Sequence, residues 1–194
     1  MQSIENTTKN ISESLKKWLY EADKNIVVCI DGYSGAGKTT ILKKLAGENE
    51  FILPIYMDDC VSTANTKENL LPQIESNSSE LILEWEPKDG IEKIRNIIAD
   101  FKSKVGSNKV LVVEGIFLFH PNLLNNLWDK RIYLDTNKEK ADARRVIREK
   151  DRFGDKYFPE THPDSFARLF KIAFKRYEEL YGPKERADLV VDVQ

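Results

Sequence analysis

The chain has 194 residues, a length sufficient to bury one sizeable core. Its composition, 41% hydrophobic and 32% charged residues, excludes a disordered tail. The formal net charge is -2, and basic and acidic residues are interspersed along the sequence. This distribution argues against nucleic acid as a partner, because binding to a phosphate backbone requires a clustered basic excess.

Short β-branched runs alternate along the chain with stretches of helical periodicity. Such alternation is typical of βαβ units that feed a parallel sheet. Several of the runs are apolar on both faces, as buried parallel strands must be. We therefore predict a three-layer α/β fold with a five-stranded parallel sheet flanked by helices. The predicted strands are Ile26–Asp31, Phe51–Met57, Lys109–Glu114, Arg131–Asp135 and Asp188–Val193.

Three amphipathic stripes predict helices that pack on this sheet. The first covers residues 4–19, the second covers residues 91–105 and stops at Gly106, and the third covers about residues 164–181 and stops at Gly182. Exposed apolar residues on the first helix make it the candidate contact of a homo-oligomer.

The least regular stretch lies between Asp58 and Glu86 and contains a long polar run. A stretch of this length without regular structure in a compact domain is usually functional or mobile, and it would form an insertion or a lid. We predict an acceptor-binding insertion at about residues 58–88 within a single domain that spans residues 1–194.

The strongest motif is Gly32–Thr39, which satisfies G-x-x-x-x-G-K-[ST] between a predicted strand and a predicted helix. Glycines let the backbone N–H groups point at phosphate oxygens, and the helix adds its positive N-terminal end. Lys38 would contact the β- and γ-phosphates of ATP, and Thr39 would contact Mg²⁺. The residues predicted to bind the cofactor are Gly32, Tyr33, Ser34, Gly35, Ala36, Gly37, Lys38, Thr39 and Thr40.

This loop alone does not separate a kinase from a GTPase, a motor or a regulatory ATPase. A GTPase is expected to carry N-K-x-D for guanine, and the nearest string, residues 137–140, has Lys140 in place of the aspartate. The sequence therefore argues against a GTPase.

Carboxylates follow two of the predicted strands, at the sheet edge where parallel α/β folds bind ligands. Asp58 and Asp59 follow the second strand, and either could accept the proton of an acceptor hydroxyl. Glu114 ends the third strand beside Gly115, where a carboxylate would hold Mg²⁺ directly or through water. The alternatives are a turn signal for the aspartate pair and a solvated strand end for Glu114.

Arginines recur after the fourth predicted strand, where Arg145, Arg148 and Arg152 repeat at intervals of three and four. A helix would present them as one basic stripe, which could close over the transferring phosphoryl group as a lid at about residues 144–160. The alternative is a solvated helix face on which these arginines pair with nearby acidic residues.

The remaining signals exclude other classes. No apolar run approaches the roughly 20 residues of a membrane span, and the first residues lack the pattern of a signal peptide, so we expect a cytoplasmic protein with no membrane partner. Cys29, Cys60, His120 and His162 show no metal-ligand spacing, so we expect no structural metal.

In order along the chain, these motifs resemble those of the uridine kinase family, which includes uridine-cytidine kinases, nicotinamide riboside kinases and the more distant phosphoribulokinases and pantothenate kinases. The resemblance covers most of the chain from Ile26 to Val193. It is carried by residues 31–40, Asp58-Asp59, Val113–Phe119, Leu134-Asp135-Thr136, Arg144–Arg148 and Ala187–Val191.

The resemblance implies an ATP-dependent and Mg²⁺-dependent kinase with a P-loop fold. It implies Asp58 as the general base, Thr39 and Glu114 as Mg²⁺ contacts, and the three arginines in a lid. It further implies that an acidic residue near Pro87 holds ribose hydroxyls, which makes Glu86 a candidate for substrate binding, along with the aspartate pair.

The chain departs from the family at the acceptor side. Uridine kinases usually carry Ser-Phe-Tyr after the catalytic aspartate, whereas Asp58 is followed here by Asp59-Cys60-Val61. The acceptor therefore stays open between uridine or cytidine, nicotinamide riboside and another small metabolite. The alternative outside the kinases is a module that binds or hydrolyses ATP for a protein partner.

Overall fold

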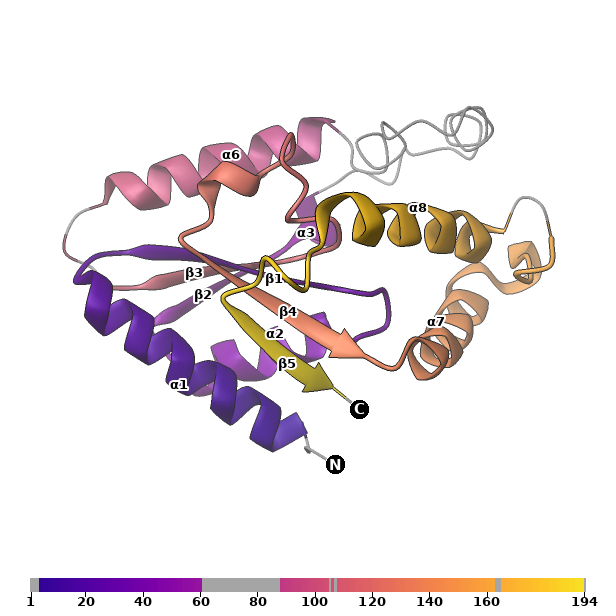
Figure 1. Ribbon diagram of the computed structural model, residues 1–194, viewed down its shortest axis with the longest axis horizontal. Coiled ribbons are helices and arrows are strands. Elements are labelled where there is room, and N and C mark those ends of the chain that lie inside the picture. The colour runs from indigo at the N-terminus through magenta and orange to yellow at the C-terminus, as the bar shows by residue number, and fades with distance from the viewer. Residues whose placement is uncertain (1–3, 61–87, 105, 107, 163–164, 194) are drawn as a thin grey trace.

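The computed structural model describes residues 4–60, 88–104, 106, 108–162 and 165–193. A parallel sheet of five strands forms its centre, in the order β2-β3-β1-β4-β5 (Figure 1). Each end of each strand lies within one residue of its predicted position. The strands are β1 Ile26–Gly32, β2 Ile52–Tyr56, β3 Val110–Glu114, β4 Lys130–Thr136 and β5 Leu189–Val193.

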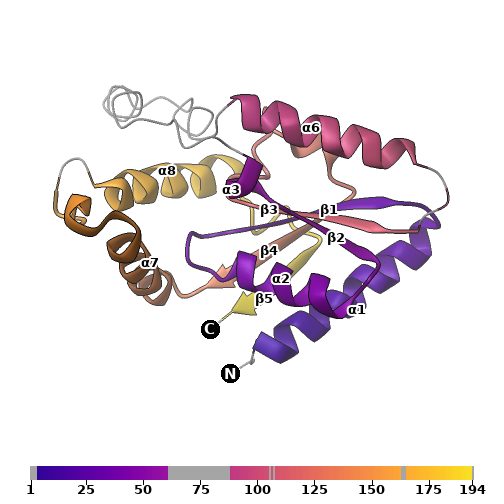
Figure 2. The ribbon, with the colours of Figure 1, turned by 180° about the vertical axis from the view of Figure 1, so that it is seen from behind.

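Helices cover both faces of the sheet, so the predicted three-layer α/β fold is confirmed. Helices α1 and α2 lie on one face, and α6 and α8 lie on the other (Figures 1 and 2). Two short 3-10 turns, Asn125–Leu127 and Gly154–Lys156, complete the described elements. The helices are α1 Ile4–Ala22, α2 Lys38–Glu48, α3 Met57–Cys60, α6 Lys88–Ser103, α7 Lys138–Phe153 and α8 Phe166–Tyr181.

The two faces of β1 feed two separate hydrophobic cores, because successive side chains of a strand point to opposite sides. Val28 and Ile30 pack with the apolar stripes of α1 and α2. Val27 and Cys29 pack with α6 and with the aromatic stripe of α8. All seven residues of β1 are buried, which explains why its first five, residues 26–30, form a continuous apolar run.

Two of the boundaries that differ from the prediction have a visible cause. The helix predicted to reach residue 105 ends at Ser103, where the amide of Lys104 bonds the carbonyl of Phe101 three residues back and tightens the last turn. Met57 was predicted to end a strand, but it begins the single turn of α3. The ladder between β2 and β3 closes at the pair of Tyr56 and Glu114, so the chain is free to turn there.

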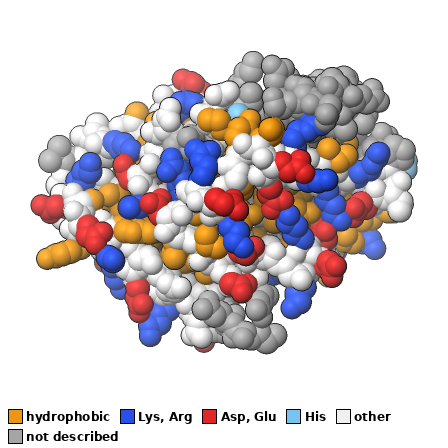
Figure 3. All heavy atoms as spheres, in the orientation of Figure 1, with side chains coloured by type: hydrophobic (Ala, Val, Ile, Leu, Met, Phe, Trp, Pro, Cys, Tyr) orange, Lys and Arg blue, Asp and Glu red, His pale blue; other side chains and the backbone are white. Residues whose placement is uncertain are grey.

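Acidic and basic side chains are interspersed over the face of the molecule that Figure 3 shows. Within the described part of the chain, no helix combines the length and the apolar character that crossing a membrane requires.

His120 is buried in the loop after β3, with 1% of its surface exposed. Its ring lies 4.5 Å from that of Tyr181, and its Nδ1 accepts a hydrogen bond from the amide of Asn122. Nε2 has no hydrogen-bond partner among the described residues. Burial lowers the pKa of His120 from 6.5 to about 4, because the charged ring would lose its hydration. The folded chain therefore holds this histidine in its neutral form.

His120 is expected to make the fold less stable in acid. The unfolded chain takes up this proton as the pH falls below about 6.5 and the folded chain only near pH 4, so its contribution to stability is lost between those values. Between pH 7 and pH 5 the loss is on the order of 2 kcal/mol. Urea unfolding at both pH values should show it in the unmodified chain and not in His120→Asn, which keeps an acceptor for Asn122. Equal losses in both proteins would rule out this role.

Candidate active site

The predicted phosphate loop joins β1 to α2 at the carboxyl edge of the sheet. Gly35 and Gly37 have φ values of 86° and 92°, in the left-handed region that glycine adopts readily, so the loop curls before α2 begins. Ala36 is fully buried and Thr40 is exposed in the first turn of α2. The helix N-terminus at the end of the curl is the usual geometry for binding an anion.

Lys38 lies inside this curl. Its Nζ donates hydrogen bonds to the carbonyl of Gly32 at 2.8 Å and to the carbonyl of Tyr33 at 3.1 Å. Burial lowers the pKa of Lys38, and the negative charges of Glu114, Asp31 and Asp58 act in the opposite direction. The ammonium is therefore surrounded by the carbonyls of the loop and by nearby carboxylates.

Thr39 and Glu114 come together from two different elements. The Oγ1 of Thr39 donates a hydrogen bond to Oε1 of Glu114 at 2.9 Å. Burial raises the pKa of Glu114, the charge of Lys38 and the hydrogen bond from Thr39 lower it, and the carboxylates of Asp58 and Asp59 raise it further. A cation at this point would offset the crowded negative charge.

The side chains here fit Mg²⁺ in the way that kinases hold it. A hydroxyl and a carboxylate oxygen lie side by side, and both are hard ligands of the kind that Mg²⁺ prefers. Among the described residues, no group of three or more His, Cys, Asp or Glu side chains could hold a metal by itself. An ion bound here would take its other ligands from water and nucleotide phosphates.

Gly115 allows α3 to pack against the end of β3. A Cβ at this position would lie 2.6 Å from the Sδ of Met57 and 3.0 Å from its Cβ, which is closer than side chains can approach. Met57 is buried and is followed by Asp58 and Asp59, both exposed. The glycine after the predicted metal ligand therefore brings the aspartate pair to the same edge of the sheet as Glu114.

The arginines predicted to form one stripe occupy different environments on α7. Arg148 is exposed, and its Nη2 donates a hydrogen bond to the Oγ of Ser34 in the phosphate loop at 3.2 Å. Arg145 is 1% exposed and pairs with Asp142 at 2.9 Å and with Glu149 at 3.7 Å. Of the two, Arg148 thus contacts the loop directly. The side chain of Arg152 lies outside the described ones.

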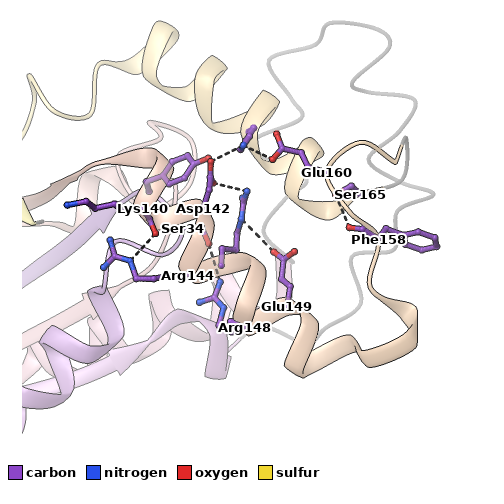
Figure 4. A network of polar contacts seen from close by, with 12 residues as sticks. Ser34, Lys140, Asp142, Arg144, Arg148, Glu149, Phe158, Glu160 and Ser165 are labelled. Carbon is purple, nitrogen blue, oxygen red and sulfur yellow. Dashed lines mark hydrogen bonds and ion pairs between the residues drawn. The ribbon is translucent and has the colours of Figure 1, made fainter.

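Figure 4 shows Arg144 and Arg148 of this part of α7 within a network of polar contacts. Arg144, which precedes the stripe, bonds the carbonyl of Lys140 at 3.2 Å and the Oγ1 of Thr136 at 3.4 Å. It therefore lies along its own helix, back toward the end of β4.

Sequence reasoning missed a buried polar cluster beneath the loop. Asp31 has no exposed surface, and its carboxylate accepts hydrogen bonds from the amide of Gly32 at 2.7 Å and from the hydroxyl of Tyr177 at 2.5 Å. The same hydroxyl accepts a hydrogen bond from the amide of Phe119 at 2.9 Å. The cluster ties the start of the phosphate loop to α8 and to the loop after β3. An aspartate at the end of an otherwise apolar strand was the signal available.

The acceptor side is described only in part. Glu86, the predicted ribose contact, lies outside the described residues, as does most of the predicted insertion. Tyr56 stands at the described margin, where burial raises the pKa of its hydroxyl, as do the charges of Glu114 and Asp59. The described edge thus carries the phosphate loop, the contact between Thr39 and Glu114, and the aspartate pair.

A family model and the similar curated proteins point to the same family. A model described as "Phosphoribulokinase / Uridine kinase family" matches residues 92–193. The uridine kinase of Chlamydia pneumoniae is 30% identical over 148 residues, which cover 67% of this chain and 66% of that protein. The phosphoribulokinase of Synechocystis sp. is 27% identical over 190 residues, which cover 89% of this chain and 55% of that protein. The chain thus matches 66% of the length of the first relative and 55% of the second.

Solved structures resemble the fold. The structure of the YGR205w protein matches with a TM-score of 0.59 at 12% identity, over 99% of this chain and 95% of that one. At this identity the likeness concerns the arrangement of helices and strands alone.

Proposed function

We propose that this chain, which belongs to the Phosphoribulokinase / Uridine kinase family, is an ATP-dependent P-loop small-molecule kinase that transfers the γ-phosphoryl group of ATP to a hydroxyl group of a nucleoside-like acceptor. The observation that carries the proposal is the convergence of a phosphate loop, a carboxylate-hydroxyl pair, an exposed aspartate pair and an arginine at one edge of the sheet. Phosphoryl transfer needs little more than such positioning and charge.

The nucleotide half of the site would be formed by the loop and the start of α2. Backbone N–H groups of residues 34–39 would receive the phosphate oxygens, with the positive end of the helix behind them. Lys38 would contribute a fixed positive charge to the β- and γ-phosphates, and its bonds to two loop carbonyls hold it in place. These contacts would orient the γ-phosphoryl group toward the open edge of the sheet.

Mg²⁺ would be held by Thr39 and Glu114, whose oxygens are adjacent. Bound there with the nucleotide, the ion would neutralise part of the charge on the transferring group. The raised pKa of Glu114, caused by burial and opposed by Lys38, supports this assignment, because a cation would offset the desolvated negative charge of that carboxylate.

Asp58 is proposed as the general base and Asp59 as the runner-up. Both are exposed on α3, and the charge of Asp58 acts on the pKa values of Lys38 and Glu114, which supports its closeness to the nucleotide side. An ionised aspartate at this edge could accept the proton of the attacking hydroxyl as the bond to phosphorus forms.

Arg148 is proposed to stabilise the charge of the transferring phosphoryl group, since it already contacts Ser34. The predictions for Arg145 and Arg152 remain: each would act from the same helix, with Arg145 buried between the loop and α8. Asp59 and Glu86 are proposed on the acceptor side. The relatives named uridine kinases support uridine or cytidine as the first acceptor to try, with nicotinamide riboside next.

A panel of acceptors tests the proposal. The chain is incubated with ATP and Mg²⁺ and with uridine, cytidine, nicotinamide riboside or non-nucleoside hydroxyl compounds, and the products are identified by mass spectrometry. We expect ADP formation to depend on one class of acceptor, which gains one phosphoryl group. Equal ADP formation with and without every acceptor would contradict the proposal and favour a module that hydrolyses ATP.

A further inference from the structure

Three successive residues of the phosphate loop lie against α7. The hydroxyl of Tyr33 donates a hydrogen bond to Oδ1 of Asp142 at 2.9 Å, and the Oγ of Ser34 accepts one from Arg148. A Cβ on Gly35 would come within 2.4 Å of the carbonyl oxygen of Ala141, so only glycine allows this approach. The loop and the helix that carries the arginines are therefore in direct contact.

Tyr33 is fixed on all sides. Its ring packs edge-on against Phe170 and Phe174 of α8, with centroids 5.1 Å and 4.9 Å away. The guanidinium carbon of Arg145 lies 5.8 Å from the centre of the ring. Burial raises the pKa of Tyr33, and its hydrogen bond to Asp142 acts in the same direction, so its hydroxyl remains a donor at neutral pH.

Asp142 gathers donors from three parts of the fold. Besides the hydroxyl of Tyr33, its carboxylate receives Nη2 of Arg145 at 2.9 Å and Nζ of Lys171 at 2.8 Å. Figure 4 shows Asp142 at the centre of these contacts, between the loop, its own helix α7 and the neighbouring helix α8. Hydrogen bonds to a charged group are stronger than neutral ones and hold a fixed geometry.

The backbone of Tyr33 contacts Lys38, the lysine of the same loop. Its carbonyl accepts a hydrogen bond from Lys38, and its neighbour Ser34 bonds Arg148. On α7, Asp142, Arg145 and Arg148 follow at intervals of three, so each is a neighbour of the next on the helix surface. A shift of the Tyr33 ring would therefore change the position of α7 relative to the loop, and with it the position of Arg148.

We propose that Tyr33 is a positioning residue, whose hydroxyl bond to Asp142 sets the separation between the phosphate loop and α7 and so holds Arg148 at the phosphates. This inference rests on the proposed function, because it takes Arg148 as the group that meets the transferring phosphoryl. Under this proposal, Arg148 contributes to catalysis only while the hydroxyl of Tyr33 is hydrogen-bonded to Asp142.

The test is a double-mutant cycle with Tyr33→Phe, Arg148→Ala and the two combined. Phenylalanine keeps the packing of the ring and removes only the hydroxyl. We expect Tyr33→Phe to lower kcat about 10-fold with little change in the KM for ATP, because a small misplacement of a charged group is costly at the transition state. We expect the combined variant to be no slower than Arg148→Ala alone.

Tyr181→Phe is the matched control, since it removes a tyrosine hydroxyl from the C-terminal end of α8, where the ring packs on His120 and Tyr177, and it should keep the kcat of the unmodified chain. Melting temperatures exclude a loss of folding. Unchanged kcat in Tyr33→Phe, or a combined effect equal to the product of the single effects, overturns the inference.

Failure of the proposed function would be seen separately, in an unmodified chain that phosphorylates no acceptor. The same cycle is therefore also measured as affinity for ADP with Mg²⁺ and aluminium fluoride, which mimics the phosphoryl group during transfer and needs no acceptor turnover. Non-additive losses of affinity in that cycle support the dependence of Arg148 on Tyr33 without any acceptor, and additive losses overturn it.

Discussion

Asp58→Asn is expected to lower kcat by on the order of 10³ while binding of ATP is retained. Asparagine has nearly the same size as aspartate but cannot take the proton of the attacking hydroxyl. Asp58 lies exposed at the carboxyl edge of the sheet, and its charge acts on Lys38 and Glu114 across the site. Turnover is measured at saturating ATP and acceptor, and nucleotide affinity is measured by calorimetry on the same samples.

Asp59→Asn is the matched control, because Asp59 is the next residue of α3 and is equally exposed. Its kcat should stay within about 3-fold of that of the unmodified chain if Asp58 is the base. A large loss in Asp59→Asn with normal turnover in Asp58→Asn would transfer the role to Asp59. Normal turnover in both variants would show that neither carboxylate of the pair accepts the proton.

Lys38→Met is expected to lower kcat/KM by on the order of 10³, the cost of removing one fixed charge from a transferring phosphoryl group. Methionine replaces the buried aliphatic stem and removes the ammonium that bonds the carbonyls of Gly32 and Tyr33. The measurement is steady-state kinetics over a range of ATP concentrations, with far-ultraviolet circular dichroism to confirm that the chain is folded.

Lys44→Met provides the comparison on the same helix. Lys44 pairs with Glu5 and Glu48 on the side of α2 that faces α1, so its loss should leave kcat/KM within about 2-fold. If both lysine variants lost activity equally, the effect would reflect damage to α2. If Lys38→Met remained fully active, the phosphate-binding role of the loop lysine would be wrong.

The fold was predictable in large part because two inner strands of its sheet, β1 and β3, are buried on both faces. In β1 and β3 every residue is buried, so each strand begins with an apolar run, residues 26–30 and 110–113, before its carboxylate at or near the end. The boundaries were less predictable, because they depend on pairing across the sheet. Met57 continues the apolar run of β2, but it begins α3 and its side chain packs against Gly115. This contact joins residues far apart in the sequence, so the apolar run alone did not show where β2 ends.

Parts of the site were predictable for two different reasons. The phosphate loop is contiguous, so its residue types and spacing specify it without any distant contact. Glu114 and Asp58 were predicted from the rule that parallel strands present ligands at their carboxyl ends, and the register of Tyr56 with Glu114 brings those strand ends together. Their catalytic roles remain predictions until the variants are measured.

The contacts that sequence reasoning missed join residues far apart in the chain. Tyr177 was assigned to the core by its helical spacing, which accounts for its ring, but its hydroxyl bonds Asp31 across 146 positions. The different environments of Arg145 and Arg148 were equally hidden, since they depend on Tyr33 and on α8. Helical periodicity placed the arginines on one face and could not say which would be buried.

The central claim is that the γ-phosphoryl group passes from ATP to a small-molecule hydroxyl, and its direct test is to follow that group. ATP labelled with ¹⁸O at the γ-phosphoryl oxygens is supplied with Mg²⁺ and the acceptor panel, and the products are weighed by mass spectrometry. The account predicts one phosphorylated acceptor that carries the label, formed in step with ADP. Label recovered only in inorganic phosphate, at a rate that no acceptor changes, would contradict it.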